Sequence, residues 1–227
     1  PGDASNLCHR AASLLQEVLA PESGVHIRLL KRIPTGAGLG GGSSDAATVL
    51  LKLPAFWNRT IDPAKLHALA TRLGADVAFF LGTGSALGRG RGDKLEFFSL
   101  DIPYWILLCN PGIHISTLWA YRKVKLGKRP YMRDLREVLD EGLRTPRILT
   151  EELVNDFEPA VFPVYPVLRD IKEEMLRGGA VYASMSGSGS SLYGFYQDEA
   201  QARAAAEAFA SRGYLTCLTA PHFQAPT

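Results

Sequence analysis

The sequence predicts an α+β protein of two lobes, residues 1–100 and 101–227. Its 227 residues are 46% hydrophobic and 21% charged, which suits one large or two small cored domains. In the first lobe a strand-like stretch, a glycine loop and a helix follow one another directly. From about residue 101 the pattern changes to strand, helices, hairpin, helix and strand, as in a separate α+β lobe.

The first lobe opens with helical periodicity. Apolar residues recur at helical spacing over residues 6–19, which indicates an amphipathic helix. The stretch VHIRLLKRIP, residues 25–34, alternates well enough to predict a strand that Pro34 ends. The glycine loop follows this strand without a linker.

Two helices and a strand complete the first lobe. Ser44 is expected to cap a helix that Pro54 ends or bends. A second helix is expected over residues 63–73, with Gly74 as its stop. A glycine-punctuated stretch follows, and KLEFFSL, residues 94–100, indicates a strand.

The second lobe reads as a sheet with covering helices. Residues 104–110 indicate a strand, 165–177 a helix, and 181–196 a hairpin built around two glycines. Asp198 is expected to cap an alanine-rich helix, and residues 214–221 close the chain as a strand.

Composition narrows the class of partner and the compartment. The net charge is +2 and no long block of like charge occurs, so the sequence carries no nucleic-acid footprint and predicts a small-molecule partner. No stretch has the length of a membrane span. Cys8, Cys109 and Cys217 lack metal-ligand spacing, and an odd number of cysteines suits a reducing cytoplasm. Cys109 and Cys217 are expected in the core, the histidines show no paired metal spacing, and we expect a monomer or homodimer.

Residues 34–47, PTGAGLGGGSSDAA, form a loop with almost no side chains. Its bare amides and the helix start behind them suit a phosphate. Gly36, Gly38 and Gly41 satisfy G-x-G-x-x-G, but no acid ends a second strand where a dinucleotide site needs one. Gly42 stands where a Walker loop requires lysine. A purely structural turn is the remaining alternative.

The loop closely resembles the ATP-binding motif of the GHMP kinases. The doubled glycine before the serines resembles the branch that phosphorylates 4-diphosphocytidyl-2-C-methyl-D-erythritol. Residues 5–15, 73–96 and 185–196 agree with the family in order and spacing, so the resemblance covers nearly the whole chain. It implies a first lobe with a left-handed β-α-β crossover, a ferredoxin-like second lobe, and ATP and Mg²⁺ as cofactors.

The resemblance also implies site residues. Asp76 matches the aspartate that orients or deprotonates the acceptor hydroxyl, although a helix N-cap is the plain alternative. Thr117 and Tyr121 match residues near the cytidine end, the alternative being a helix that packs Leu118 and Tyr121 into the core. SGSGSS, residues 186–191, matches a third motif beside the phosphates, or is only a turn. Positions that match the nucleotide site are Asn6, Leu7, Lys31, Pro34, Thr35, Gly36, Ala37, Gly38, Leu39, Gly40, Gly41, Gly42, Ser43 and Ser44.

Two matters stay open in the sequence. One of Ser43 and Ser44 is expected to contact the phosphates or the metal while the other caps the helix. The family's catalytic aspartate works beside a lysine in an amino-terminal segment that has no counterpart here, so the first lobe is expected to be incomplete.

The implied activity is ATP-dependent phosphorylation of the 2-hydroxyl of 4-diphosphocytidyl-2-C-methyl-D-erythritol in non-mevalonate isoprenoid biosynthesis. The alternatives are a nucleotide-binding protein of the same fold with impaired catalysis, and another small-molecule GHMP kinase.

Overall fold

The computed structural model describes residues 3–90, 92, 94–124 and 133–224. Contacts divide the chain into two units. The first unit runs from the amino end to Ile33 and continues over Gly40–Leu100. The second comprises Pro34–Leu39 and Asp101–Gln224. The segment Pro34–Leu39, called the arm below, therefore belongs with the second unit, although its sequence position lies within the first.

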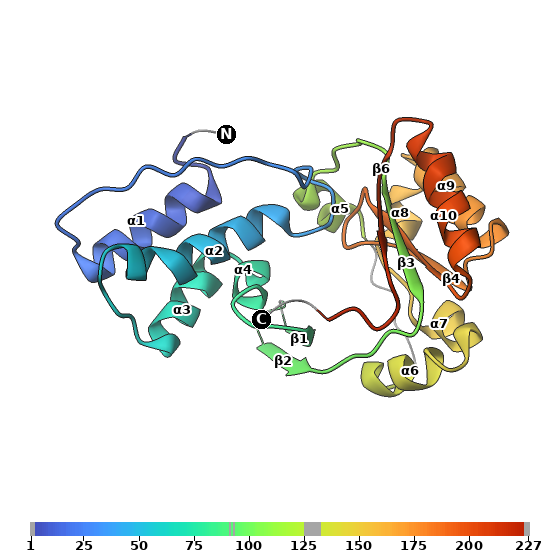
Figure 1. The fold of residues 1–227 in the computed structure, drawn as a ribbon, viewed down its shortest axis with the longest axis horizontal. Helices are drawn as coiled ribbons and strands as arrows, with labels where there is room; N and C mark the ends of the chain where they lie inside the picture. The colour runs from blue at the N-terminus through green and yellow to red at the C-terminus, as the bar shows by residue number, and fades with distance from the viewer. Residues whose placement is uncertain (1–2, 91, 93, 125–132, 225–227) are drawn as a thin grey trace. The chain divides into compact units, whose positions relative to one another are not determined.

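The first unit is mainly helical, with one hairpin (Figure 1). Its elements are α1 (Leu7–Leu19), α2 (Gly41–Phe56), α3 (Pro63–Leu73), α4 (Ala75–Phe79), β1 (Ser85–Arg89) and β2 (Lys94–Phe98). The predicted helix over residues 6–19 is confirmed as α1, where the Asn6 side chain accepts a hydrogen bond from the Cys8 amide at 2.9 Å. Figure 1 shows α1 lying along α2, with which it builds the core of this unit.

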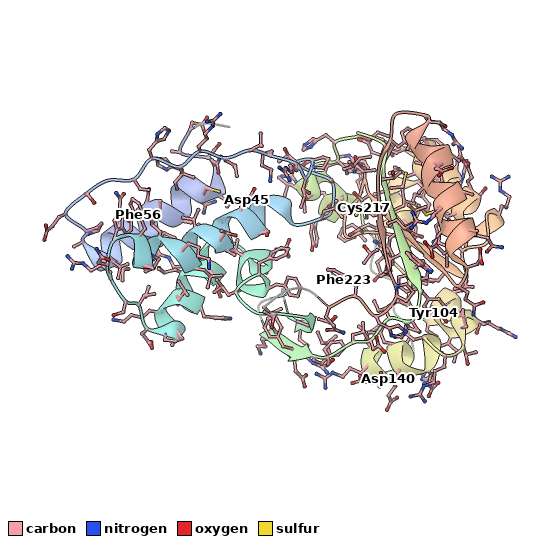
Figure 2. All side chains as sticks on the ribbon, in the orientation of Figure 1. Asp45, Phe56, Tyr104, Asp140, Cys217 and Phe223 are labelled. Atoms are coloured by element: carbon pink, nitrogen blue, oxygen red, sulfur yellow. The ribbon has the colours of Figure 1, made fainter. Side chains whose placement is uncertain are left out.

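Helix α2 begins earlier and ends later than the sequence predicts. Gly40, with φ +63°, occupies the N-cap position, and the Ser44 amide donates to the Gly40 carbonyl at 2.9 Å. Ser44 therefore lies inside the first turn, and the prediction that it caps α2 is wrong. Pro54 lies in the last turn, where its missing N–H removes one bond, and the helix continues to Phe56. Figure 2 shows Asp45 and Phe56 toward opposite ends of α2.

The strand predicted over residues 25–34 is wrong. This segment makes no strand pairing within the described residues, and its apolar Leu29, Leu30 and Ile33 are exposed. An alternating pattern specifies two faces but no partner, and a strand needs a partner. A strand that the sequence missed, β1, pairs antiparallel with β2, Ser85 lying opposite Phe98. The left-handed crossover stays a prediction.

The second unit is a four-stranded antiparallel sheet in the order β4-β5-β3-β6. Its elements are β3 (Trp105–Asn110), α5 (Thr117–Lys123), α6 (Leu135–Gly142), α7 (Pro146–Glu152), α8 (Glu158–Val161), α9 (Pro166–Arg177), β4 (Tyr182–Met185), β5 (Leu192–Tyr196), α10 (Glu199–Ala210) and β6 (Leu215–Thr219). Taken with α9 and α10, the strands form the β-α-β-β-α-β order of a ferredoxin-like lobe, as predicted.

Helices α9 and α10 cover one face of this sheet (Figure 1). The Asp198 side chain accepts a hydrogen bond from the Gln201 amide at 2.9 Å and caps α10, as predicted. Cys109 on β3 is fully buried, and burial raises the pKa of its thiol to about 12, which agrees with an inert core residue. Cys217 on β6 is exposed, so its predicted core position is wrong (Figure 2). It lies on β6, an edge strand that pairs only with β3 among the residues that the structure describes.

The buried and exposed faces of α2 allow a matched test of the core of the first unit. Leu50 is 0% exposed and its neighbour Leu51 is 44% exposed. Leu50→Ala should lower the free energy of unfolding by about 2 to 5 kcal/mol because it leaves a cavity among helices α1 to α4. Leu51→Ala should cost less than about 1 kcal/mol. Calorimetric unfolding of both variants checks this, and equal losses would contradict the described packing of α2.

Candidate active site

The arm is held through its carbonyl groups. Four successive carbonyl oxygens each have a donor from the second unit. The pairs are Thr35 O with His114 Nδ1 (3.1 Å), Gly36 O with Ile115 N (3.4 Å), Ala37 O with Ser191 N (3.0 Å) and Gly38 O with Ser186 Oγ (2.8 Å). The carbonyls from Thr35 to Gly38 are thus all engaged.

The amide groups of the arm have no such partners. Within the described ranges, none of the amides from Gly36 to Leu39 donates a hydrogen bond. Gly36 has φ +67° and Gly38 has φ +74°, whereas Ala37 between them is not in the left-handed region. When residues in the left-handed region alternate with residues of negative φ, successive amides can turn toward a common point and make an anion-binding concavity. The geometry of the arm therefore suits a phosphate.

Glycine is required at position 38 by contact as well as by conformation. A Cβ on Gly38 would overlap the carbonyl oxygen of Ser186, which is backbone and has little freedom to move. The close approach of these two segments brings the 186–191 loop against the arm. The 186–191 loop therefore does more than join β4 to β5, because it also holds the arm.

The start of α2 continues the chain directly from the arm. Gly40 has no side chain with which to cap the helix, so the first-turn amides depend on other partners. A helix of 16 residues also places partial positive charge at this end. The Lys31 ammonium, paired with Asp45, also lies beside this turn, because its Nζ would be 3.4 Å from a Cβ on Gly41. The helix start is thus a second position suited to an anion.

The structure brings two predicted nucleotide residues to the start of α2. Lys31 pairs with Asp45 on α2, which Figure 2 labels. The Leu7 side chain would lie 3.9 Å from a Cβ on Gly42, so it packs beside the first turn. Asn6 is next to Leu7, and its side-chain oxygen accepts the hydrogen bond from the Cys8 amide that caps α1. Lys31 is therefore an ion-paired residue.

Asp76 lies on α4, in the same unit as the start of α2. Gly74 is the N-cap of α4, so the alternative that Asp76 caps this helix is wrong. Asp76 is exposed to solvent, whereas the next two residues, Val77 and Ala78, are buried in the core of this unit. One turn later, the Phe80 ring would lie 2.7 Å from a Cβ on Gly40. Helix α4 therefore packs against the first residues of α2 and presents an available carboxylate.

Thr117 and Tyr121 lie one turn apart on α5 in the second unit. Thr117 Oγ1 is 3.3 Å from Ser188 Oγ, which ties α5 to the 186–191 loop. Tyr121 is 63% exposed and its ring meets Phe157 edge-on at 4.9 Å between centroids. Leu118 is exposed as well, so the alternative that α5 packs Leu118 and Tyr121 into the core is wrong.

Two asparagines that the sequence reading passed over hold the 186–191 loop. Asn110 is 1% exposed, and its Nδ2 donates to Ser190 Oγ at 3.2 Å and to Ser191 Oγ at 3.0 Å. Asn155 Nδ2 donates to the carbonyls of Met185 at 2.6 Å and Gly187 at 2.8 Å. The signal for Asn110 was present, because an amide ends the apolar strand YWILLCN. Asn155 lies in a loop with no pattern that points to it.

The predicted site residues thus fall into two groups, each described within its own unit. Leu7, Lys31, the start of α2 and Asp76 belong to the first, and the arm, Thr117 and Tyr121 to the second. In the part of the chain that the structure describes, no group of three or more His, Cys, Asp or Glu side chains could hold a metal ion. Among the described helices, none combines the length and the apolar character needed to cross a bilayer.

Comparison with known proteins agrees with this arrangement of motifs. Family models match at both ends, GHMP kinases N terminal domain over residues 6–84 and GHMP kinases C terminal over residues 135–215. The 4-diphosphocytidyl-2-C-methyl-D-erythritol kinase of Chlorobium limicola is 47% identical, covering 98% of this chain and 78% of the relative. The protein of the same name from Chlorobium phaeobacteroides strain BS1 is 46% identical over the same shares.

Solved structures show the same fold. A crystal structure of 4-(cytidine 5'-diphospho)-2C-methyl-D-erythritol kinase superposes with a TM-score of 0.77 at 38% identity, covering 96% of this chain and 78% of that chain. Homoserine kinase from Cytophaga hutchinsonii gives 0.73 at 22% identity, covering 98% and 78%, and shows the fold alone. With both family models matched and relatives near half identity over almost its full length, this chain belongs to the GHMP kinase family.

Proposed function

We propose that this chain transfers the γ-phosphoryl group of ATP to the 2-hydroxyl of 4-diphosphocytidyl-2-C-methyl-D-erythritol. The observation that carries the proposal is the arm, whose four engaged carbonyls leave its amides directed away from the protein's own acceptors. The names of relatives at 47% and 46% identity supply the acceptor. Free Cys8, Cys109 and Cys217 support a cytoplasmic location as part of the proposal.

Residues 34–44 would bind the triphosphate. Backbone amides are suited to this task because they carry no net charge, add no bulk and are already oriented before the ligand arrives. Ser43 or Ser44, both at the start of α2, would direct a hydroxyl toward the same anion. Mg²⁺ would neutralise phosphate charge during transfer, and a serine hydroxyl, phosphate oxygens and water are the hard donors that it prefers.

Asp76 would accept the proton of the acceptor hydroxyl. The hydroxyl oxygen forms a bond to the γ-phosphorus, the bond from that phosphorus to the bridging oxygen breaks, and ADP leaves with the electron pair. An exposed carboxylate on a short helix that is anchored by buried Val77 and Ala78 is both accessible and fixed in position. Accessibility and a fixed position are two of the properties that a general base needs to reach the proton it removes.

Thr117 and Tyr121 would contact the cytidine end of the acceptor. An exposed tyrosine ring already fixed edge-on against Phe157 offers its face to a base with little loss of side-chain freedom. The bond of Thr117 to Ser188 links this surface to the 186–191 loop, and through Ser186 to the arm. The second unit thus connects a base-binding surface with a phosphate-binding segment.

The deciding experiment is a coupled assay of ADP release with different acceptors. The proposal expects turnover with the cytidine-containing acceptor and little with galactose, homoserine or mevalonate. Equal turnover with an acceptor that lacks cytidine would favour another small-molecule kinase of the family. ATP binding with no turnover on any acceptor would favour a nucleotide-binding protein with impaired catalysis.

Asp76→Asn should lower kcat by about 10²- to 10⁴-fold, because it removes the proton acceptor. The dissociation constant of an ATP analogue, measured by calorimetry, should stay near the wild-type value. Asp62→Asn, at the exposed N-cap of α3, is the matched control and should leave kcat unchanged. Equal loss of nucleotide binding and of kcat in Asp76→Asn would show that Asp76 is structural.

Gly38→Ala should weaken nucleotide binding by at least about 10-fold. The added Cβ would overlap the Ser186 carbonyl and also disfavour φ +74°, which together displace the arm. Gly24→Ala is its control, since a Cβ there would meet nothing within 4 Å. Titration with a fluorescent ATP analogue measures the affinity of both variants. Unchanged affinity in Gly38→Ala would contradict the proposal that the arm binds nucleotide.

Tyr121→Ala should raise KM for the cytidine acceptor by about 5- to 150-fold, the range that corresponds to losing one base–aromatic stack of about 1 to 3 kcal/mol. Tyr121→Phe should retain most of the affinity because it keeps the ring. KM for ATP should not change in either variant. A Tyr121→Ala enzyme with an unaltered acceptor KM would place the base elsewhere.

A further inference from the structure

We propose that His114 is a positioning residue that holds the first residues of the arm in the conformation that binds nucleotide. The inference rests on the proposed function in one respect, namely that the arm binds the phosphates of ATP. The role of His114 is separate from that of the arm, because its side chain contacts the arm and not the ligand. His114 lies in the segment between β3 and α5.

Two contacts join His114 to the arm. Its Nδ1 lies 3.1 Å from the Thr35 carbonyl oxygen. A carbonyl can only accept, so Nδ1 must carry the hydrogen, and the neutral ring has its lone pair on Nε2. The ring also covers Gly36 so closely that a Cβ on Gly36 would overlap Nδ1 and Cε1. One imidazole thus fixes the arm by a hydrogen bond and by contact at consecutive residues.

The backbone on both sides of His114 is itself fixed. The next residue, Ile115, is 1% exposed in the core of the second unit, and its amide donates to the Gly36 carbonyl at 3.4 Å. The preceding residue, Ile113, accepts a hydrogen bond through its carbonyl from Ser190 Oγ. His114 therefore projects from a rigid segment, and consecutive residues 114 and 115 bind consecutive carbonyls of the arm.

This arrangement has a thermodynamic use in nucleotide binding. A glycine-rich segment loses more backbone freedom on ordering than any other kind, and a ligand that must order it binds more weakly. Contacts that order the arm in the free protein remove that cost. They also keep the carbonyls turned away from an incoming anion, which the carbonyl oxygens would repel.

The test measures nucleotide affinity directly, with a non-hydrolysable ATP analogue and Mg²⁺. His114→Ala should weaken binding by about 2- to 12-fold, the range that corresponds to one net hydrogen bond of about 0.5 to 1.5 kcal/mol. His114→Asn should recover most of the loss, because its Nδ2 can stand where Nδ1 stood. KM for the acceptor should not change, and neither variant should shift Tm by more than about 2 °C.

The control is His67→Ala, at an exposed position on α3 in the first unit, which should bind the analogue like the wild type. Unchanged affinity in His114→Ala, or equal losses in the Ala and Asn variants, would overturn the role. A parallel loss of Tm would overturn it too, since it would mark a general structural effect. If the wild type binds the analogue but does not phosphorylate the cytidine acceptor, the proposed function fails while the role of His114 is still decided. A wild type that binds no nucleotide overturns both.

Discussion

The hydrogen bonds between the arm's carbonyls and the loops of the second unit are the constraint on which the rest of the site depends. In a planar trans peptide group the N–H points away from the C=O, so a carbonyl held against the protein directs its amide the other way. Four such groups in succession, from Thr35 to Gly38, turn a flexible sequence into a fixed row of donors. The glycines supply the backbone conformation, and the second unit supplies the restraint.

The restraint is itself supported by buried polar residues. Asn110, at the end of β3, holds Ser190 and Ser191, and Ser190 in turn holds Ile113 beside His114. A buried amide that lost these partners would incur the cost of an unsatisfied polar group, about 1 to 3 kcal/mol. Removing one member of this network would therefore leave its buried partners unsatisfied as well. These hydrogen bonds connect the end of β3 to the segments that hold the arm.

Much of the fold followed from the sequence because strong local signals agreed with it. Helices α1 and α10 had polar caps at their starts, α9 had a proline in its first turn, and the β4-β5 hairpin had two glycines between β-prone runs. The errors have physical causes. Residues 25–34 alternate like a strand, but pairing depends on a partner that periodicity does not reveal. Helix α2 was predicted to begin at Ser44, but Gly40 in the left-handed region takes the N-cap position. Ser44 therefore lies inside the helix and does not cap it.

The candidate site divides in the same way. The glycine loop could be predicted from its own consecutive residues, whereas Asp76 was predicted only through the resemblance to the GHMP kinases. His114 and Asn155 act on the arm or on the 186–191 loop from distant parts of the chain, so that only the fold brings them together. The sequence also could not show that Tyr121 stays exposed on α5, because a helix with two aromatic residues reads equally well as a core helix.

The assignment of the arm to the second unit has a consequence for anyone who wishes to exchange parts between members of this family. The chain changes unit after Ile33, after Leu39 and after Leu100, so neither unit is one uninterrupted stretch. A chimera joined at residue 100 would combine the arm of one parent with the donors of another, and any mismatch would leave buried amides such as that of Ser191 without an acceptor. A sound hybrid carries residues 34–39 together with the lobe that follows residue 100.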